Sequence, residues 1–261
     1  MKVEVLVATV NADINKLINQ MNIQTDAIIV NQGDKHSYEE IKHKGRTIKV
    51  YNFKERGVGL SRNTSLMRAT SDIVLFADDD EVLVDNYENI IVSEFLKNKK
   101  ADMIVFDLIS SGGTRKAHQI KKNKKLGKYN SLKYGAVRFA VKLDKIRKNN
   151  ISFSLLFGGG CQYGSGEDSI FIYDCIKRKM NVRTSSTKIA VIDFSDSTWF
   201  KGYNNKFYFD KGALFHSLHG NACILFSFIY LLTHVKEKSN LSFREKFSLM
   251  CKGYLSMKGS N

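Results

Sequence analysis

Short apolar segments alternate with amphipathic segments over the first three-quarters of the chain. Residues 3–10 are β-branched and alternate, which predicts a strand, and residues 13–22 place apolar side chains on one face of a helix. The other predicted strands are 26–34 (with a turn), 47–51, 72–77, 101–109, 135–143, 181–184 and 188–193. The other predicted helices are 60–67, 83–97, 142–150 and one that begins near 167. This order predicts an α/β fold with a mostly parallel mixed sheet.

Two polar segments interrupt this order. Residues 37–44 carry so few apolar side chains that we expect an exposed helix or loop. Residues 110–128 are rich in Gly, Ser and Lys, which is typical of a mobile loop. That loop is either a solvated run of charge or a basic lid over a ligand.

The C-terminal part has a different character. Residues 213–234 are strongly apolar, but their most hydrophobic part, 222–232, is short for a membrane span. Two interpretations remain open: basic amphipathic helices on the inner face of the cell membrane, or helices that pack on the catalytic domain or on a partner subunit in an oligomer. We therefore expect a catalytic domain over residues 1–205 and a helical extension over 206–261, which the first interpretation places on the membrane.

Charge and cysteine content narrow the class of partner. The formal charge of +15 favours anionic partners, namely nucleotides, nucleic acid or an acidic membrane surface. The four cysteines form no closely spaced pair, which argues against a zinc site or a disulfide framework. The first ten residues resemble a strand more than a signal peptide. We therefore expect a cytoplasmic protein, which the membrane interpretation of residues 206–261 would place peripherally on the inner face of the cell membrane.

An acidic cluster follows the strand at residues 72–77. Asp78, Asp79, Asp80 and Glu81 come at its carboxyl end, where α/β sheets bind their ligands. A hard cation such as Mn²⁺ or Mg²⁺ would relieve the mutual repulsion of these carboxylates and could also hold substrate phosphates. The alternative is a solvated acidic turn that caps a helix starting near Val82.

A second candidate site lies in the glycine-rich segment 157–171. Glu167 and Asp168 stand there at the predicted start of a helix, directly after Gly166. Acids in the first turn of a helix are good caps. Capping and catalysis are therefore equally compatible with this segment.

The segment Gly57-Val-Gly-Leu-Ser-Arg62-Asn63, followed by the strand that ends at Asp78-Asp79-Asp80, resembles family-2 glycosyltransferases of the GT-A fold. The resemblance runs from residue 1 to about residue 202, and Gly164-Ser-Gly-Glu167-Asp168 is similar to the Glu-Asp motif of that family. It implies a single nucleotide-sugar-binding α/β domain with a C-terminal helical extension. It also implies that Asp168 is the base of an inverting reaction and that Glu167 orients the acceptor.

The same resemblance implies roles for further positions. The residues expected to bind the nucleotide sugar are Thr9, Asn31, Gln32, Arg62, Asp78 and Asp79. Asp80 is expected to bind the metal, with Asp193 as a further ligand, and Trp199 and Gly166 are expected at the acceptor. Without the resemblance, Arg62 is equally compatible with a surface position on its helix.

The predicted reaction is transfer of a sugar from a nucleoside diphosphate sugar, with UDP favoured, to a hydroxyl of a glycan or lipid-linked acceptor in bacterial surface polysaccharide synthesis. One alternative is a nucleotidyltransferase that makes the sugar nucleotide, although no glycine-rich basic loop follows the first strand. The other is a nucleic-acid-binding module that uses the basic run 115–148, which carries no known binding motif. We expect no nucleic-acid partner.

Overall fold

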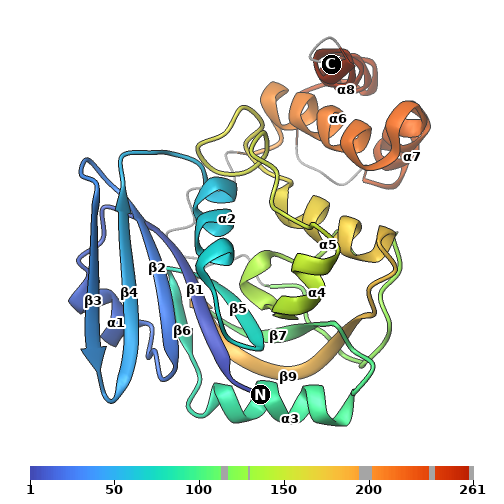
Figure 1. The fold of residues 1–261 in the computed structure, drawn as a ribbon. Coiled ribbons are helices and arrows are strands. Elements are labelled where there is room, and N and C mark those ends of the chain that lie inside the picture. Colours follow the sequence, from blue (N-terminus) through green and yellow to red (C-terminus); the bar gives the residue numbers. More distant parts are fainter. Residues whose placement is uncertain (113–116, 129, 194–201, 235–238, 259–261) are drawn as a thin grey trace.

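The computed structural model is an α/β sheet domain with a group of C-terminal helices on one end (Figure 1). It describes residues 1–112, 117–128, 130–193, 202–234 and 239–258. In these residues the strand order of the sheet is β3-β4-β2-β1-β5-β8-β7-β9-β6. Parallel and antiparallel pairs both occur, so the predicted mixed α/β architecture is confirmed.

The first part of the chain builds the parallel core of the sheet. Its strands β4, β2, β1 and β5 run parallel to one another. Their bounds and those of the helices between them are β1 Val3–Val10, α1 Ile14–Gln20, β2 Asp26–Gln32, β4 Arg46–Phe53, α2 Val58–Arg68 and β5 Ile73–Asp78. Asp13 caps α1 by accepting a hydrogen bond from the backbone N–H of Lys16, in line with its predicted place at the helix start.

The expectation for residues 37–44 was wrong. Ser37–His43 forms an edge strand, β3, which pairs antiparallel with β4. A two-residue turn joins the strands, and both of its residues have positive φ, 48° at Lys44 and 79° at Gly45. Such turns match the twist of a hairpin, so the turn and not an apolar pattern fixes this exposed strand.

The second part of the chain adds strands of mixed direction. Its elements are β6 Glu81–Leu83, α3 Tyr87–Lys97, β7 Met103–Ser111, the 3₁₀ turn Ala136–Arg138, β8 Phe139–Lys142, α4 Leu143–Lys148, α5 Glu167–Lys177 and β9 Val182–Asp193. Strand β8 lies between β5 and β7 and is antiparallel to both. The result is one continuous sheet with apolar side chains buried on both of its faces.

Two boundaries in this part differ from the sequence prediction. The expected strands 181–184 and 188–193 are one strand, β9, because shifts in its register with β7 accommodate the extra residues between them. A helix does not begin near Val82, because Glu81–Leu83 pairs with β9 as strand β6. Helix α3 starts only at Tyr87, after Asn86 with φ of 58°.

The basic segment 117–128 is anchored to the sheet. Ile120 and Leu126 are buried, and the backbone N–H of Ile120 donates to the Asp107 carboxylate at 3.1 Å. The backbone N–H of Lys124 donates to Thr184 Oγ1 at 3.0 Å. This part is therefore held in place, while residues 113–116 of the predicted lid lie outside the described residues.

The C-terminal helices are α6 Asn205–His219, the 3₁₀ turn Gly220–Ala222, α7 Cys223–Thr233 and α8 Phe243–Lys258. Helices α6 and α8 cross at two glycines. A methyl group on Gly212 would overlap the backbone carbonyl of Met250, and one on Gly253 would overlap that of Phe209. The predicted helical extension is thus present, and α6 begins beside the predicted boundary at residue 205.

Candidate active site

The carboxyl ends of three parallel strands bring the predicted nucleotide-binding residues together. Thr9 on β1 is paired with Asn31 on β2, and Ala8 is paired with Asp78 at the end of β5. Since these ends meet at one edge of the sheet, the acidic cluster lies beside Thr9. Thr9 Oγ1 donates a hydrogen bond of 2.5 Å to Asp79 Oδ2, which joins β1 to the cluster.

The two amides on β2 hold neighbouring loops in this structure. Asn31 accepts a bond from the backbone N–H of Ala12 at 3.1 Å and donates to Asn52 Oδ1 at 2.9 Å. Gln32 donates to the backbone carbonyl of Gly57 at 3.1 Å, at the start of α2. Both side chains are buried, so contact with a nucleotide stays a prediction for these positions.

Helix α2 is fixed by its glycines and by Asn63. Gly57 precedes it with φ of +125°, a conformation that L side chains rarely adopt, and a methyl on Gly59 would overlap the backbone carbonyl of Ser154. Asn63 makes two bonds to the backbone of Phe153, donating to its carbonyl at 2.9 Å and accepting from its N–H at 2.7 Å. This close contact fixes the orientation of α2 and therefore the direction of the neighbouring Arg62 side chain.

Arg62 lies at the centre of the site and is not a surface residue, since its side chain is 3% exposed. Nη2 donates to both carboxylate oxygens of Asp78, at 2.8 and 3.1 Å. Nη1 donates to Asp168 Oδ1 at 2.8 Å and to Glu167 Oε1 at 3.2 Å. One guanidinium therefore binds the end of β5 and the start of α5 at the same time. Burial alone would lower the pKa of Arg62, but the three carboxylates raise it and keep the charge in place.

Glu167 and Asp168 do more than cap a helix. Gly166 holds the N-cap position of α5 and both carboxylates bond to Arg62, while Glu167 Oε2 also accepts from the backbone N–H of Gly166 at 3.0 Å. Burial and the charge of Asp168 raise the pKa of Glu167 to about 7. Burial also raises the pKa of Asp168, and the charge of Arg62 opposes that rise. Asp168 keeps 24% of its side chain exposed, so a proton donor can reach it.

Two carboxyl groups of the acidic cluster, Asp80 and Glu81, have raised pKa values. Burial, followed by the charges of Asp78 and Asp79, raises the pKa of Asp80 to about 6. Both carboxylate oxygens of Glu81 are buried, and neither has a hydrogen-bond partner in the part of the chain that the structure describes. Burial and the nearby Asp78 and Asp80 raise the pKa of Glu81 well above its usual value.

These oxygens fit a hard divalent cation in chemical type and in charge. The cluster does not form a complete metal-binding site on its own, however. Among the described residues, no group of three or more His, Cys, Asp or Glu side chains is arranged to hold a metal ion. A cation at Asp80 would therefore take further ligands from water or from the phosphates of a substrate, as Mg²⁺ commonly does.

The remaining predicted site residues lie at different distances from this centre. Asp193 ends β9 directly after Ile192, the partner of Glu81, so the antiparallel register places it beside Asp80 at the same end of the strand pair. Gly166 precedes Glu167 and Asp168 and packs against Leu214 of α6, where a side chain would collide. Trp199 lies outside the described residues, and its predicted acceptor contact stays a prediction.

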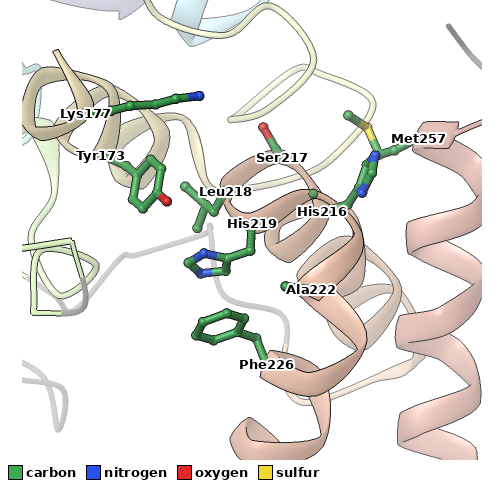
Figure 2. Close-up of a pocket in the computed structure, with 10 residues that line it drawn as sticks. Tyr173, Lys177, His216, Ser217, Leu218, His219, Ala222, Phe226 and Met257 are labelled. Carbon is green, nitrogen blue, oxygen red and sulfur yellow. The ribbon is translucent and has the colours of Figure 1, made fainter.

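A cavity of about 610 Å³ is found elsewhere, between the C-terminal half of α5 and the C-terminal helices. Figure 2 shows Tyr173 and Lys177 of α5 on one side of it and His216, His219 and Phe226 on the other. The ring of His219 stacks on Phe226 at 3.8 Å and meets Tyr173 edge-on. None of the predicted site residues lines this cavity, so it is separate from the Arg62 centre.

With this geometry in view, comparison with known proteins decides the family. Residues 7–156 match the family model described as glycosyl transferase family 2, which is more than half of the chain. The chain belongs to glycosyl transferase family 2. The matched range includes Thr9, Arg62 and the acidic cluster but ends before Glu167. No curated protein matches the sequence of this glycosyltransferase.

Solved structures confirm the GT-A-type fold of the glycosyltransferase. The crystal structure of S. aureus TarS 1-349 in complex with UDP-GlcNAc has a TM-score of 0.61 and 16% identity, with all of this chain and 73% of that chain covered. The complex with UDP gives 0.57 and 15%, with coverage of 100% and 72%. A longer TarS structure gives 0.57 and 16%, and this glycosyltransferase spans 44% of its length. At this identity the likeness shows the fold alone.

Three features of the site had not been predicted. The sequence marks Asn63 only as part of a motif, whereas the structure shows that it attaches α2 to Phe153. Glu81 was grouped with the three aspartates, and the structure shows it buried beneath the cluster because it lies on β6 with Val82 facing outward. The third feature is the direct link from Arg62 to the Glu167–Asp168 motif. No local pattern signals the burial of Glu81, because Glu81-Val82-Leu83 does not alternate in polarity.

Proposed function

We propose that this glycosyltransferase moves a sugar from a nucleoside diphosphate sugar to a hydroxyl of an acceptor, with inversion at the anomeric carbon. The observation that carries the proposal is the Arg62 bridge, which joins Asp78 at the acidic strand end to Asp168 at the start of α5. A donor-binding carboxylate and a candidate base thus belong to one site.

The donor is proposed to be a UDP-sugar that lies at the ends of β1, β2 and β5. TarS, which shares the fold, has been crystallised with UDP-GlcNAc and with UDP, and this supports a uridine nucleotide here. Asp78 and Asp79 are proposed to contact ribose and phosphate, because Arg62 and Thr9 hold these two carboxylates in place from either side. Asn31 and Gln32, at the end of β2, are proposed to contact the nucleobase of the donor.

Asp80 is proposed to hold Mn²⁺ or Mg²⁺, with Asp193 beside it. Bound there, the cation would neutralise the negative charge that builds up on the diphosphate as the bond to the sugar breaks. The pKa of Asp80, raised by burial and then by Asp78 and Asp79, supports this assignment, because a bound cation would offset the crowding of negative charge.

Asp168 is proposed as the general base. It accepts the proton of the acceptor hydroxyl while that oxygen forms a bond to the anomeric carbon, and the bond from this carbon to the diphosphate oxygen breaks with its electron pair on the leaving group. Arg62 fixes Asp168 through Oδ1, and the partly exposed carboxylate can still meet an acceptor. Glu167 and Gly166 are proposed to orient the acceptor, and Trp199 is proposed to contact it.

The acceptor is proposed to be a growing glycan or a lipid-linked saccharide in bacterial surface polysaccharide synthesis, handled at the cytoplasmic face of the membrane. The net charge of +15 supports an acceptor that carries phosphate or lies on an acidic surface. The TarS-like fold supports this class of pathway by analogy alone.

Thermal unfolding with a panel of nucleoside diphosphates, each with and without Mn²⁺, tests the donor and the metal together. We expect UDP with Mn²⁺ to raise Tm more than UDP, GDP or Mn²⁺ alone. Incubation with UDP-sugars should then release UDP. Protein that responds to no sugar nucleotide in the presence of Mn²⁺ would contradict the proposal, and consumption of UTP with a sugar 1-phosphate would assign it to nucleotide-sugar formation instead.

A further inference from the structure

The outward face of α7 is apolar from Ile224 to Leu232. The side chains on this face, at positions that repeat with the helical period, are between 44% and 61% exposed, and they are Ile224, Leu225, Phe228, Ile229 and Leu232. The opposite face, with Cys223, Ser227 and Leu231, is buried against the neighbouring helices. We call the five exposed residues the α7 face.

A helix that faced water on one side would carry polar residues there. The α7 face carries none, and Phe243 of α8, itself 40% exposed, extends it through ring contact with Phe228. Other exposed apolar side chains, such as Met67 on α2 and Leu96 on α3, stand on separate elements. Isolated exposures of that kind are ordinary, whereas a contiguous apolar face marks a surface for binding.

The α7 face does not belong to a helix that crosses a membrane. Residues Asn205–Thr233 are long and apolar enough for a span by length and composition. The α6 half is used inside the protein, however: buried Asp210 accepts bonds from Lys206 at 2.8 Å and from the backbone N–H of Gly164 at 2.9 Å. Gly220, with φ of 58°, separates α7 from it. The 11 residues of α7 alone reach about 16 Å, which is half of a bilayer core.

The basic residues around the α7 face favour an anionic partner. Residues 205–258 contain eight Lys or Arg and three Asp or Glu in the sequence. Lys211 Nζ lies 5.6 Å from the Tyr230 ring of α7, exposed Arg244 follows Phe243, and Asp210 is already paired within the protein. A second copy of this chain would bring two basic surfaces together, which like-charge repulsion opposes. An acidic lipid surface complements both the apolar residues and the bases.

We propose that the α7 face lies in the interface of an acidic phospholipid bilayer, with α7 parallel to the membrane plane and the neighbouring lysines and arginines against the headgroups. Figure 1 shows α7 at the outer end of the C-terminal helices, away from the sheet. Through Asp210 and Gly164, the same helices also hold the glycine-rich segment that leads to Asp168. The membrane-bound surface is thus rigidly connected to the catalytic domain.

Co-sedimentation with vesicles tests this surface. We expect the full chain to bind vesicles of phosphatidylglycerol and phosphatidylcholine in equal parts, to bind pure phosphatidylcholine much less, and to release as salt rises. The double variant Leu225→Glu/Ile229→Glu should lose at least about tenfold in affinity, because two apolar side chains leave the interface. The matched control is Met67→Glu/Leu96→Glu, which adds the same charge at exposed apolar positions outside the α7 face.

Equal vesicle binding by both double variants, or no binding by the unmodified protein, would overturn the proposal. An oligomer in solution that dissociates in Leu225→Glu/Ile229→Glu would assign the α7 face to contact between copies instead. Stabilisation by UDP and Mn²⁺, measured without vesicles, should be the same in both variants. That readout separates failure at the membrane from failure of the proposed transferase reaction.

Discussion

Arg62 Nη1 and Asp168 Oδ1 are 2.8 Å apart, although the two residues are 106 positions apart in the chain. Burial raises the pKa of Asp168, and Arg62 holds that rise in check. Arg62→Met removes the opposing charge, so the pKa of Asp168 should rise further. A base works only when deprotonated, and the acid limb of the pH–rate profile should therefore move to higher pH.

The control for this prediction is Arg62→Lys. It keeps the charge but loses the bridge to Asp78, so a smaller pH shift should come with weaker donor binding. Circular dichroism establishes that each variant is folded, which matters because Arg62→Met leaves three carboxylates without their common partner. An acid limb that does not move in folded Arg62→Met would show that Arg62 does not tune the base.

Asp168→Asn separates donor binding from chemistry. Asparagine can still accept a bond from Arg62, so the site should keep its shape, but it cannot take a proton from the acceptor. Transfer should fall by about 10² to 10⁴-fold. Stabilisation by UDP and Mn²⁺ should stay within error of the unmodified protein. Near-normal transfer would move the role of base to Glu167, whose pKa of about 7 also suits it.

Asp80→Asn should have opposite effects with and without metal. The folded protein raises the pKa of Asp80 from 3.8 to about 6, so it binds this proton more tightly than the unfolded chain does. The stability that depends on this proton is present at low pH and is lost as pH rises through 6. At pH 8 and without metal, Asp80→Asn should therefore raise Tm slightly, by less than the pKa shift alone implies, because Asp80 is exposed and water screens its charge. At pH 4 the difference from the unmodified protein should shrink.

With Mn²⁺ and UDP present, the order should reverse. The unmodified protein gains stability from the bound ligands, and Asp80→Asn should gain little, because a carboxylate that holds the cation is missing. Differential scanning fluorimetry over a Mn²⁺ titration measures both effects. An equal Mn²⁺-dependent rise in Tm for the variant would remove Asp80 from the metal site.

Much of the fold and part of the site follow from local sequence signals. The apolar strand at residues 72–77 and the acids after it predict ligand binding at a sheet edge, and the register of β1 with β5 confirms that Thr9 and the cluster meet there. Family resemblance added the motif at Glu167–Asp168. Strand β3 was not predicted because its side chains are polar and its extended conformation depends on pairing with β4.

The bonds of Arg62 could not be predicted from its local sequence. The sequence of α2 is equally compatible with an exposed Arg62. The carboxylates that bind its guanidinium belong to distant positions, Asp78, Glu167 and Asp168. Burial of Glu81 likewise depends on β9, which supplies the partner strand more than 100 residues later. Such contacts are decided by tertiary packing, which single-sequence patterns do not contain.

The crossing of α6 and α8 gives the last prediction. A methyl group at Gly212 would overlap the backbone carbonyl of Met250, and backbone can yield only if the two helices separate. Gly212→Ala should destabilise the protein by about 1 to 3 kcal/mol, which lowers Tm by several degrees. Gly127→Ala is the control, because no atom lies near its added methyl. If Gly212→Ala melts like the control, the helices do not pack this closely; if it melts lower yet keeps UDP stabilisation, the nucleotide site does not depend on their close contact.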